Sequence, residues 1–199
     1  MNKPTLKYFL RDEKAMAPSK RAEDSGYDLY AIIDDDYLIL EPGESKLFKT
    51  GLSVALPAGW GFFICNRGGI GSKNLVYGAH VVDSGYRGEV FIDLHNIGDT
   101  PIIITAPPKK DATKEEIQAY LINMFIEEFN GNERKLSRQE LFELIMAIRS
   151  DEYRFIDKNK AIAQGVILQT PDCDTEEVFT LEALGESLRG SGALGSSGK

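Results

Sequence analysis

The sequence has few of the residues that build metal and disulfide sites. It contains two cysteines and two histidines in 199 residues. Cys65 lies in an apolar run and Cys173 in an acidic loop, so the pair forms neither a disulfide framework nor a metal-ligand spacing. His80 and His95 have no partner at the spacing of zinc ligands. We therefore expect two plain thiols and no zinc site.

The sequence also lacks an excess of positive charge and any long apolar run. Its formal net charge is −8, whereas a nucleic-acid-binding surface needs clustered cations to displace counterions from phosphates. No segment approaches the roughly 20 apolar residues of a membrane span, and the first ten residues lack the apolar core of a signal peptide. We expect a soluble, cytoplasmic protein that binds neither nucleic acid nor a membrane. Any anionic ligand must be held by local features rather than by the overall field.

Most of the chain consists of short apolar runs separated by Gly, Pro and other turn residues. Asp83-Ser84-Gly85 favours a chain reversal and is followed by the alternating run Val90 to Leu94, so this stretch predicts a hairpin. Strands at such spacing indicate an antiparallel sandwich or barrel. The other strand candidates are residues 5–10, 37–40, 46–48, 52–56, 60–65, 75–77, 102–105, 161–168 and 177–181.

Two segments in the second half have helical patterns instead. Thr113 to Glu116 and Ser137 to Glu140 both match a capping box, and apolar residues follow each at helical spacing. Gly131 ends the first run. We predict two helices in an antiparallel hairpin. The predicted organisation is a mainly β domain of residues 1–110 and 158–199, with residues 111–157 as a helical insertion and 183–199 as a flexible Gly/Ser-rich tail.

Five separated segments carry polar residues that suit work on phosphates. They read S-G-Y-D-L at 25–29, R-G-G-I-G-S-K at 67–73, V-V-D-S-G-Y-R-G-E at 81–89, A-I-A-Q at 161–164, and a Gly/Ser-rich tail that opens with Arg189-Gly190. In this order they resemble the five motifs of the trimeric dUTPase family, the deoxyuridine triphosphate nucleotidohydrolases. The resemblance implies a jelly-roll-like barrel that assembles as a homotrimer with sites shared between subunits. It also implies Mg²⁺-dependent hydrolysis of dUTP to dUMP and pyrophosphate.

The chemistry of a triphosphate explains why such residues are needed. A nucleoside triphosphate carries about four negative charges, which must be neutralised while a water is aimed at phosphorus. The resemblance implies Mg²⁺ on the phosphates, with Asp28 reaching its water shell. The residues that it implies around the phosphates are Arg67, Gly68, Gly69, Ser72 and Gln164, together with Arg189, Gly195, Ser196 and Ser197 of the tail.

The third motif supplies the reacting water and the sugar contact. By resemblance, Asp83 orients and deprotonates the water that attacks the α-phosphorus, and Tyr86 lies under the deoxyribose and leaves no room for a 2′-hydroxyl. Because an Asp at its ordinary pKa is a weak base, positioning should matter more than basicity. The base would be read by the backbone around His80, Val82 and Phe91, with Leu194 packed over it.

Three residues depart from the family pattern. Gly68 stands where the family usually has Ser, so a hydroxyl expected to donate to the α,β-bridging oxygen is missing, and Ser72 or a water is the candidate substitute. His80 replaces a usual Gly, and Leu194 replaces a usual Phe that would stack on uracil. These departures leave open the turnover rate and the identity of the base.

Other functions are compatible with the same residues. One is a pyrophosphatase for a modified deoxyuridine triphosphate or for dCTP. Another is a regulatory or protein-interaction protein on a dUTPase scaffold that acts through residues 111–157. Bacteriophage members of the family carry extra segments at this place, which suggests a phage protein working in the host cytoplasm. The helical pair could equally be structural, covering a face or rim of the sheet.

Overall fold

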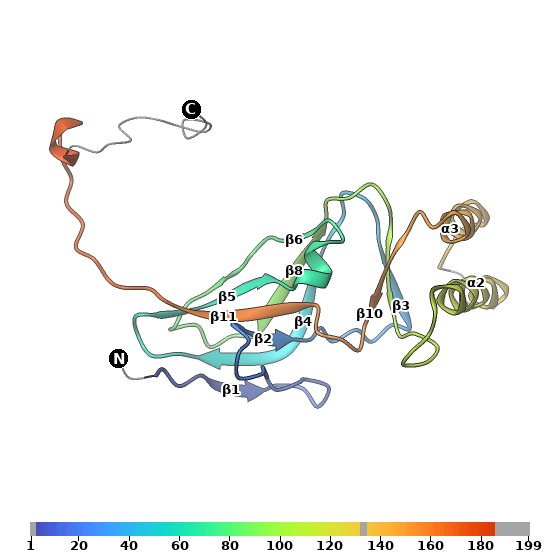
Figure 1. Ribbon diagram of the computed structural model, residues 1–199, viewed down its shortest axis with the longest axis horizontal. Coiled ribbons are helices and arrows are strands. Elements are labelled where there is room, and N and C mark those ends of the chain that lie inside the picture. The colour runs from blue at the N-terminus through green and yellow to red at the C-terminus, as the bar shows by residue number, and fades with distance from the viewer. Residues whose placement is uncertain (1–2, 132–134, 186–199) are drawn as a thin grey trace.

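The protein is mainly β, as predicted, with a pair of longer helices near its C-terminal third (Figure 1). The computed structural model describes residues 3–131 and 135–185. The strands are β1 (Lys7–Leu10), β2 (Gly26–Leu29), β3 (Tyr37–Leu40), β4 (Ser45–Ala55), β5 (Trp60–Asn66), β6 (Leu75–Tyr77), β7 (Val81–Val82), β8 (Val90–Asn96), β9 (Ile102–Thr105), β10 (Arg154–Asp157) and β11 (Ala163–Gln169). The helices are α1 (Gly68–Gly71), α2 (Lys114–Asn130), α3 (Arg138–Ser150) and the 3₁₀ turn η1 (Glu182–Leu184).

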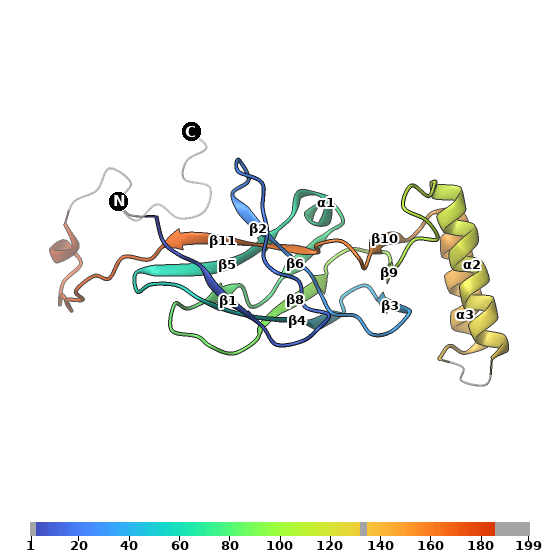
Figure 2. The same cartoon turned by 90° about the horizontal axis from the view of Figure 1, so that it is seen from below.

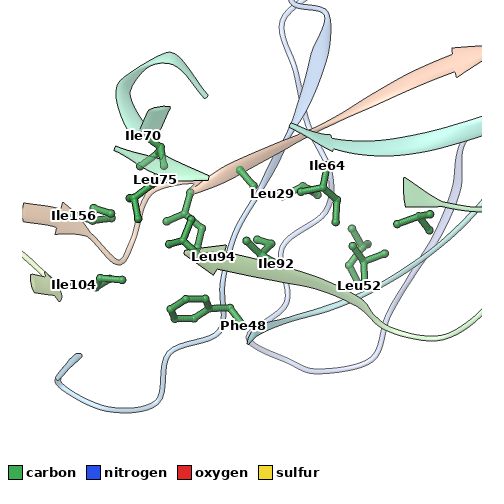
Figure 3. Close-up of a cluster of buried hydrophobic side chains, with 14 of the residues drawn as sticks. Leu29, Phe48, Leu52, Ile64, Ile70, Leu75, Ile92, Leu94, Ile104 and Ile156 are labelled. Atoms are coloured by element: carbon green, nitrogen blue, oxygen red, sulfur yellow. The ribbon is translucent and has the colours of Figure 1, made fainter. Parts of the chain in front are cut away.

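The strands form three sheets that share one hydrophobic core. Their orders are β1-β4-β8-β6, β10-β9-β3 and β2-β11-β5-β7. Figure 3 shows side chains from all three sheets meeting, among them Leu29, Ile92 and Ile104. These three are almost completely buried. Burial of apolar surface from three sheets in one cluster closes the barrel-like body and holds the strand ends in place.

The sheet β10-β9-β3 is apolar on both faces because a different layer covers each one. Along β9, Ile102 and Ile104 point into the shared core, whereas Ile103 belongs to a second cluster with Leu121 and Phe125 of α2. This alternation follows from the two-residue period of a strand. The helices therefore cover the outer face of this sheet, at one end of the molecule (Figure 2).

The two helices are antiparallel neighbours, as predicted. The Lys114 ammonium at the start of α2 forms an ion pair with Asp151 just after α3, and Gln118 Nε2 donates to the Ile148 carbonyl at 2.9 Å. Both predicted capping boxes are present. The side chains of Thr113 and Ser137 each accept a hydrogen bond from the backbone N–H three residues later, and the glutamate side chain there accepts one from the backbone N–H of the capping residue.

Several sequence-based expectations for the strands were wrong. Residues 46–48 and 52–55 belong to one long strand, β4, which ends one residue before the predicted bound, and its register shifts between Lys49 and Leu52 at a bulge where Gly51 has φ of 63°. Residues 177–181 form no strand, and the chain runs from β11 as an extended arm to η1 (Figure 1). The segment Arg154–Asp157, inside the range predicted to be helical, is strand β10.

Strand β10 also breaks the expected antiparallel pattern, because it pairs in parallel with β9. Parallel neighbours need a long crossover connection. Here α2 and α3 supply it, so the helical pair is tied into the sheet through both of its ends.

Candidate functional site

A cavity of about 790 Å³ gathers residues from three of the motifs. Asp28 comes from β2, Gln164 from β11, and Arg67 follows the end of β5, with Gly68 and Gly69 next to it on α1. These positions are up to 136 residues apart in sequence (164 − 28). The fold thus brings together five of the predicted phosphate-side residues.

Strand register sets the geometry of this group. Gln164 lies opposite Asp28 on one side and opposite Cys65 on the other, since β11 runs between β2 and β5. Arg67 Nε is 3.1 Å from Asp28 Oδ1, and Arg67 Nη1 donates to the Ala161 carbonyl at 2.7 Å. Both side chains are about one-third exposed. The guanidinium is therefore held in place with its remaining N–H groups available to an anion.

Gln164 is oriented by the strand next to it. Its Nε2 donates to the Asn66 carbonyl at 2.7 Å, and a side chain at Gly26 would meet its Oε1 at 2.4 Å. Gly26, in the S-G-Y-D-L segment, thus leaves the space that the Gln164 side chain occupies. This gives a physical reason for glycine beside Tyr27 and Asp28.

Sequence reasoning missed three cations in the cavity. Arg21, Lys73 and Lys160 line it. Lys73 closes the R-G-G-I-G-S-K segment and Lys160 directly precedes A-I-A-Q, so proximity to the motifs was the signal that could have found them. The pKa of Asp24 is lowered by its hydrogen bonds from Arg21, whose Nε lies 2.9 Å away.

The charges around the cavity balance within the described residues. Four lining residues are basic and four are acidic. A triphosphate with about four negative charges would need further positive charge in such a site. The basic members are Arg21, Arg67, Lys73 and Lys160, and the acidic members are Glu23, Asp24, Asp28 and Asp157.

The stretch around Asp83 is not the predicted hairpin. Strand β7 pairs with β5, whereas β8 pairs with β4 and β6 in another sheet. Residues 83–89 therefore cross from one sheet to the other. The local turn is as expected, because Tyr86 N donates to the Asp83 carbonyl at 3.1 Å.

Backbone and side-chain contacts hold this crossing. The Tyr86 hydroxyl donates to the Glu89 carbonyl at 3.1 Å, and Glu89 Oε1 accepts from the Gly51 N–H at the β4 bulge at 2.8 Å. A side chain at Gly88 would lie 2.2 Å from the Tyr86 hydroxyl oxygen. The phenol therefore lies directly against Gly88.

The crossing and the cavity are separate in one chain. Asp83 and Tyr86 are exposed and do not line the cavity. Val82, the residue before Asp83, pairs with Phe62 of β5, and Phe62 is five residues before Arg67. At a strand rise of about 3.3 Å per residue, Val82 and Arg67 are therefore separated by roughly 16 Å along β5. One chain by itself does not bring the predicted water-activating aspartate to the predicted phosphate ligands.

The predicted base-side residues are dispersed too. The His80 carbonyl accepts from the Ile64 N–H at 2.8 Å, so the backbone next to β5 is already paired. Val82 is buried in the core, and Phe91 lies on β8, in a different sheet. Ser72 does not line the cavity, and its hydroxyl lies 3.4 Å from the Gly69 carbonyl oxygen. The predicted tail residues Arg189, Leu194, Gly195, Ser196 and Ser197 lie outside the described residues.

Two features that the described residues lack bear on the kind of site. Across residues 3–131 and 135–185, His, Cys, Asp and Glu side chains nowhere gather in a group of three that could hold a metal ion. Within the same ranges, no helix is long and apolar enough to cross a membrane.

Comparison with known proteins identifies relatives of this chain. The dUTPase family model matches residues 12–109. A deoxyuridine 5'-triphosphate nucleotidohydrolase of Desulfitobacterium hafniense is 34% identical over 132 residues, which are 64% of this chain and 83% of the relative. One from Leptospira interrogans is 43% identical over 83 residues, or 40% of this chain, and the match spans 57% of that relative's length.

Solved structures with a similar fold come from staphylococcal bacteriophages. A mutant dUTPase of Staphylococcus bacteriophage 80alpha, solved with dUpNHpp, is 25% identical with a TM-score of 0.62, and the match covers 97% of this chain and 98% of that one. The dUTPase of phage phi11 of S. aureus, described as showing a species-specific insert, is 25% identical with a TM-score of 0.56, covering 90% of this chain and 99% of that one.

Proposed function

Since this chain belongs to the dUTPase family, we propose that it hydrolyses dUTP to dUMP and pyrophosphate. The observation that carries the proposal is the cluster of Asp28, Arg67 and Gln164 in one cavity, each from a different motif. Arg67 and Gln164 offer N–H donors to phosphate oxygens, and guanidinium binds such oxygens in a bidentate manner.

Mg²⁺ is the cofactor of this activity, and the residues present fit it. The cavity has balanced charge and a single motif carboxylate, Asp28, rather than a cage of protein ligands. This donor set suits a small cation that keeps most of its waters and binds chiefly through phosphates. Asp28 would hold it through water, and the ion would neutralise phosphate charge. Arg67 and Asp28 would then exchange their mutual ion pair for contacts with the bound nucleotide.

Asp83 activates the water, and Tyr86 excludes ribonucleotides. Asp83 lies on an exposed crossing that is braced by the β4 bulge, so its carboxylate is presented from a well-held backbone. A general base of this kind contributes about 10²- to 10⁴-fold to the rate. His80, Val82 and Phe91 would read the base, and the tail from Arg189 would close over the phosphates.

A homotrimer with shared sites explains why one chain separates the two halves. The Asp83 crossing of one subunit would face the Asp28–Arg67 cavity of its neighbour. Closed rings of identical subunits are a common way to complete such a site. The assembly would work in the cytoplasm, that of the host cell if the protein is encoded by a phage.

Pyrophosphate release from dUTP, dCTP, dTTP and UTP, with and without Mg²⁺, tests the activity. We expect strong preference for dUTP and no turnover without the ion. If no deoxyuridine triphosphate is hydrolysed, the enzymatic function is wrong and a regulatory or protein-interaction function on the same scaffold explains the sequence better. A preference for dCTP or a modified deoxyuridine triphosphate would revise only the base.

Mixing two inactive variants tests the shared site. Asp83→Asn and Arg67→Ala chains, each inactive alone, should regain about one quarter of wild-type activity when unfolded together and refolded in equal amounts, because a quarter of the sites then combine two intact halves. If both halves came from one chain, mixing would restore nothing.

We also propose that residues 1–110 and 158–199 form the catalytic domain together with strand β10, whose Asp157 lines the cavity, and that the remaining, helical part of residues 111–157 is an accessory segment. A partner-binding role for this segment is favoured by α3, where Phe142 is 65% exposed and Met146 46% exposed on the side away from the sheet. Phe142→Glu should leave dUTP turnover unchanged whether the accessory segment binds a partner or is only structural. A fall in turnover with this variant would tie α3 to catalysis instead.

A further inference from the structure

Arg11, just after β1, reaches the crossing that carries Asp83 and Tyr86. Its backbone N–H continues the strand pairing by donating to the Gly51 carbonyl at 2.7 Å. Its side chain then donates from Nη2 to the Arg87 carbonyl at 2.7 Å and from Nε to the Ser53 hydroxyl. Arg11 lies in none of the five motifs, and these contacts span 76 residues of sequence.

Ser53 extends the contact to the next residue of the crossing. It is 7% exposed on β4, and its hydroxyl donates to the Gly88 carbonyl at 2.7 Å. Arg11 and Ser53 together therefore hold two successive carbonyls, those of Arg87 and Gly88. A hydroxyl that accepts from a guanidinium becomes a stronger donor to its own acceptor.

Gly88 connects this pair to the sugar-selecting side chain. The Tyr86 hydroxyl oxygen lies 2.2 Å from where a side-chain carbon of residue 88 would be, so the phenol packs directly against Gly88, and a shift of the Gly88 backbone would press on it. We propose that Arg11, through Ser53 and Gly88, is a positioning residue for Tyr86 and sharpens the discrimination between deoxyribose and ribose. This inference rests on the proposed dUTP hydrolysis, and it adds a specificity determinant outside the motifs.

The geometry requires arginine rather than any cation. Two N–H groups of one planar guanidinium serve two acceptors, the Ser53 hydroxyl and the Arg87 carbonyl. A lysine ammonium is a point charge on a flexible stem and does not reproduce this fork. Arg11→Lys should therefore behave like Arg11→Ala, which separates positioning from simple charge.

The test is the ratio of kcat/KM for dUTP to that for UTP, both with Mg²⁺. Loss of folded protein lowers both values equally and leaves the ratio unchanged, whereas a displaced Tyr86 lowers the ratio. We expect a fall of about tenfold in Arg11→Ala, Arg11→Lys and Ser53→Ala, which corresponds to one lost charge-assisted hydrogen bond. Lys7→Ala is the matched control, since Lys7 is a cation on β1, the strand that leads into Arg11, and lies opposite Ala55. Its ratio should equal that of the wild type.

The outcomes separate this inference from the proposed function. An unchanged ratio in the Arg11 variants, or an equal fall in Lys7→Ala, would overturn the positioning role while wild-type dUTP hydrolysis stands. A wild type without dUTP hydrolysis would overturn the function itself. Should Arg11→Ala fail to fold, Ser53→Ala and Arg11→Lys decide the question by the same ratio.

Discussion

Replacing Gly68 with serine should raise the activity of this protein. Gly68 lines the cavity beside Arg67 and is the first residue of α1. A Cβ at this position meets nothing within 4 Å. Gly68 is not among the glycines with positive φ. Serine therefore fits without displacing a neighbour and without backbone strain.

The size of the effect follows from what the hydroxyl would do. A donor aimed at charge that develops in the transition state is worth about 10²- to 10³-fold in rate. Water can serve part of this role in the native protein, so we expect kcat for dUTP to rise about 10- to 100-fold, or roughly 1.4 to 2.7 kcal/mol. Gly→Ser within a helical turn changes stability by only about 0.5 kcal/mol, which is too little to account for such a rise.

Steady-state pyrophosphate release at saturating dUTP measures this effect. Gly68→Ala is the matched control, because it adds the same Cβ, which meets nothing within 4 Å, but no hydroxyl. Without a donor for the bridging oxygen, its kcat should stay near that of the wild type. An unchanged or lower kcat in Gly68→Ser would refute the reasoning, as would an equal rise in both variants.

Three further predictions address the water, the helices and pH. Asp83→Asn should lower kcat about 10²- to 10⁴-fold while calorimetric binding of a non-hydrolysable dUTP analogue persists; wild-type turnover would remove Asp83 from its role. Phe125→Ala removes a fully buried ring whose centroid is 4.8 Å from that of Tyr37. It should lower the free energy of unfolding in urea by about 3 to 5 kcal/mol, whereas Phe142→Ala, at an exposed position, should lower it by less than about 0.5 kcal/mol. Equal losses would contradict the packing of the helices on the sheet. Hydrogen bonds from Ser137 lower the folded-state pKa of Glu140 below 4.5. Its stabilisation is therefore present above pH 4.5 and lost as the pH falls through the folded pKa, so the stability difference between wild type and Glu140→Gln should vanish in acid; a constant difference would exclude this linkage.

Local features could be predicted because near neighbours decide them. The capping boxes at Thr113 and Ser137 depend on contacts three residues apart, and both were predicted with the correct partners. Strands at 37–40, 75–77 and 102–105 were predicted with the bounds that the structure has. The strand at 154–157 was missed, because Arg154 and Asp157 leave only two apolar residues between them and its partner strand, β9, is distant in sequence.

The crossing at residues 83–89 shows where local patterns fail. Asp, Ser and Gly favour a reversal whether the next strand pairs back or joins another sheet. Val82 pairs with Phe62, and Phe91 pairs with Lys49. Both partners are distant in sequence. Arg11 was overlooked for the same reason, since its acceptors at Ser53 and Arg87 become neighbours only when three strands and the crossing have assembled.

The sequence by itself determined the chemical groups, their order along the chain and the local turns and helix ends that present them. Only the tertiary structure decided which groups meet. Strand register brings Asp28, Gln164 and Arg67 into one cavity. The pairing of Val82 with Phe62 leaves Asp83 near the start of β5, whereas Arg67 follows its end. The reason is physical: an extended strand is stiff and advances about 3.3 Å per residue, so groups anchored five residues apart along it cannot converge within one chain.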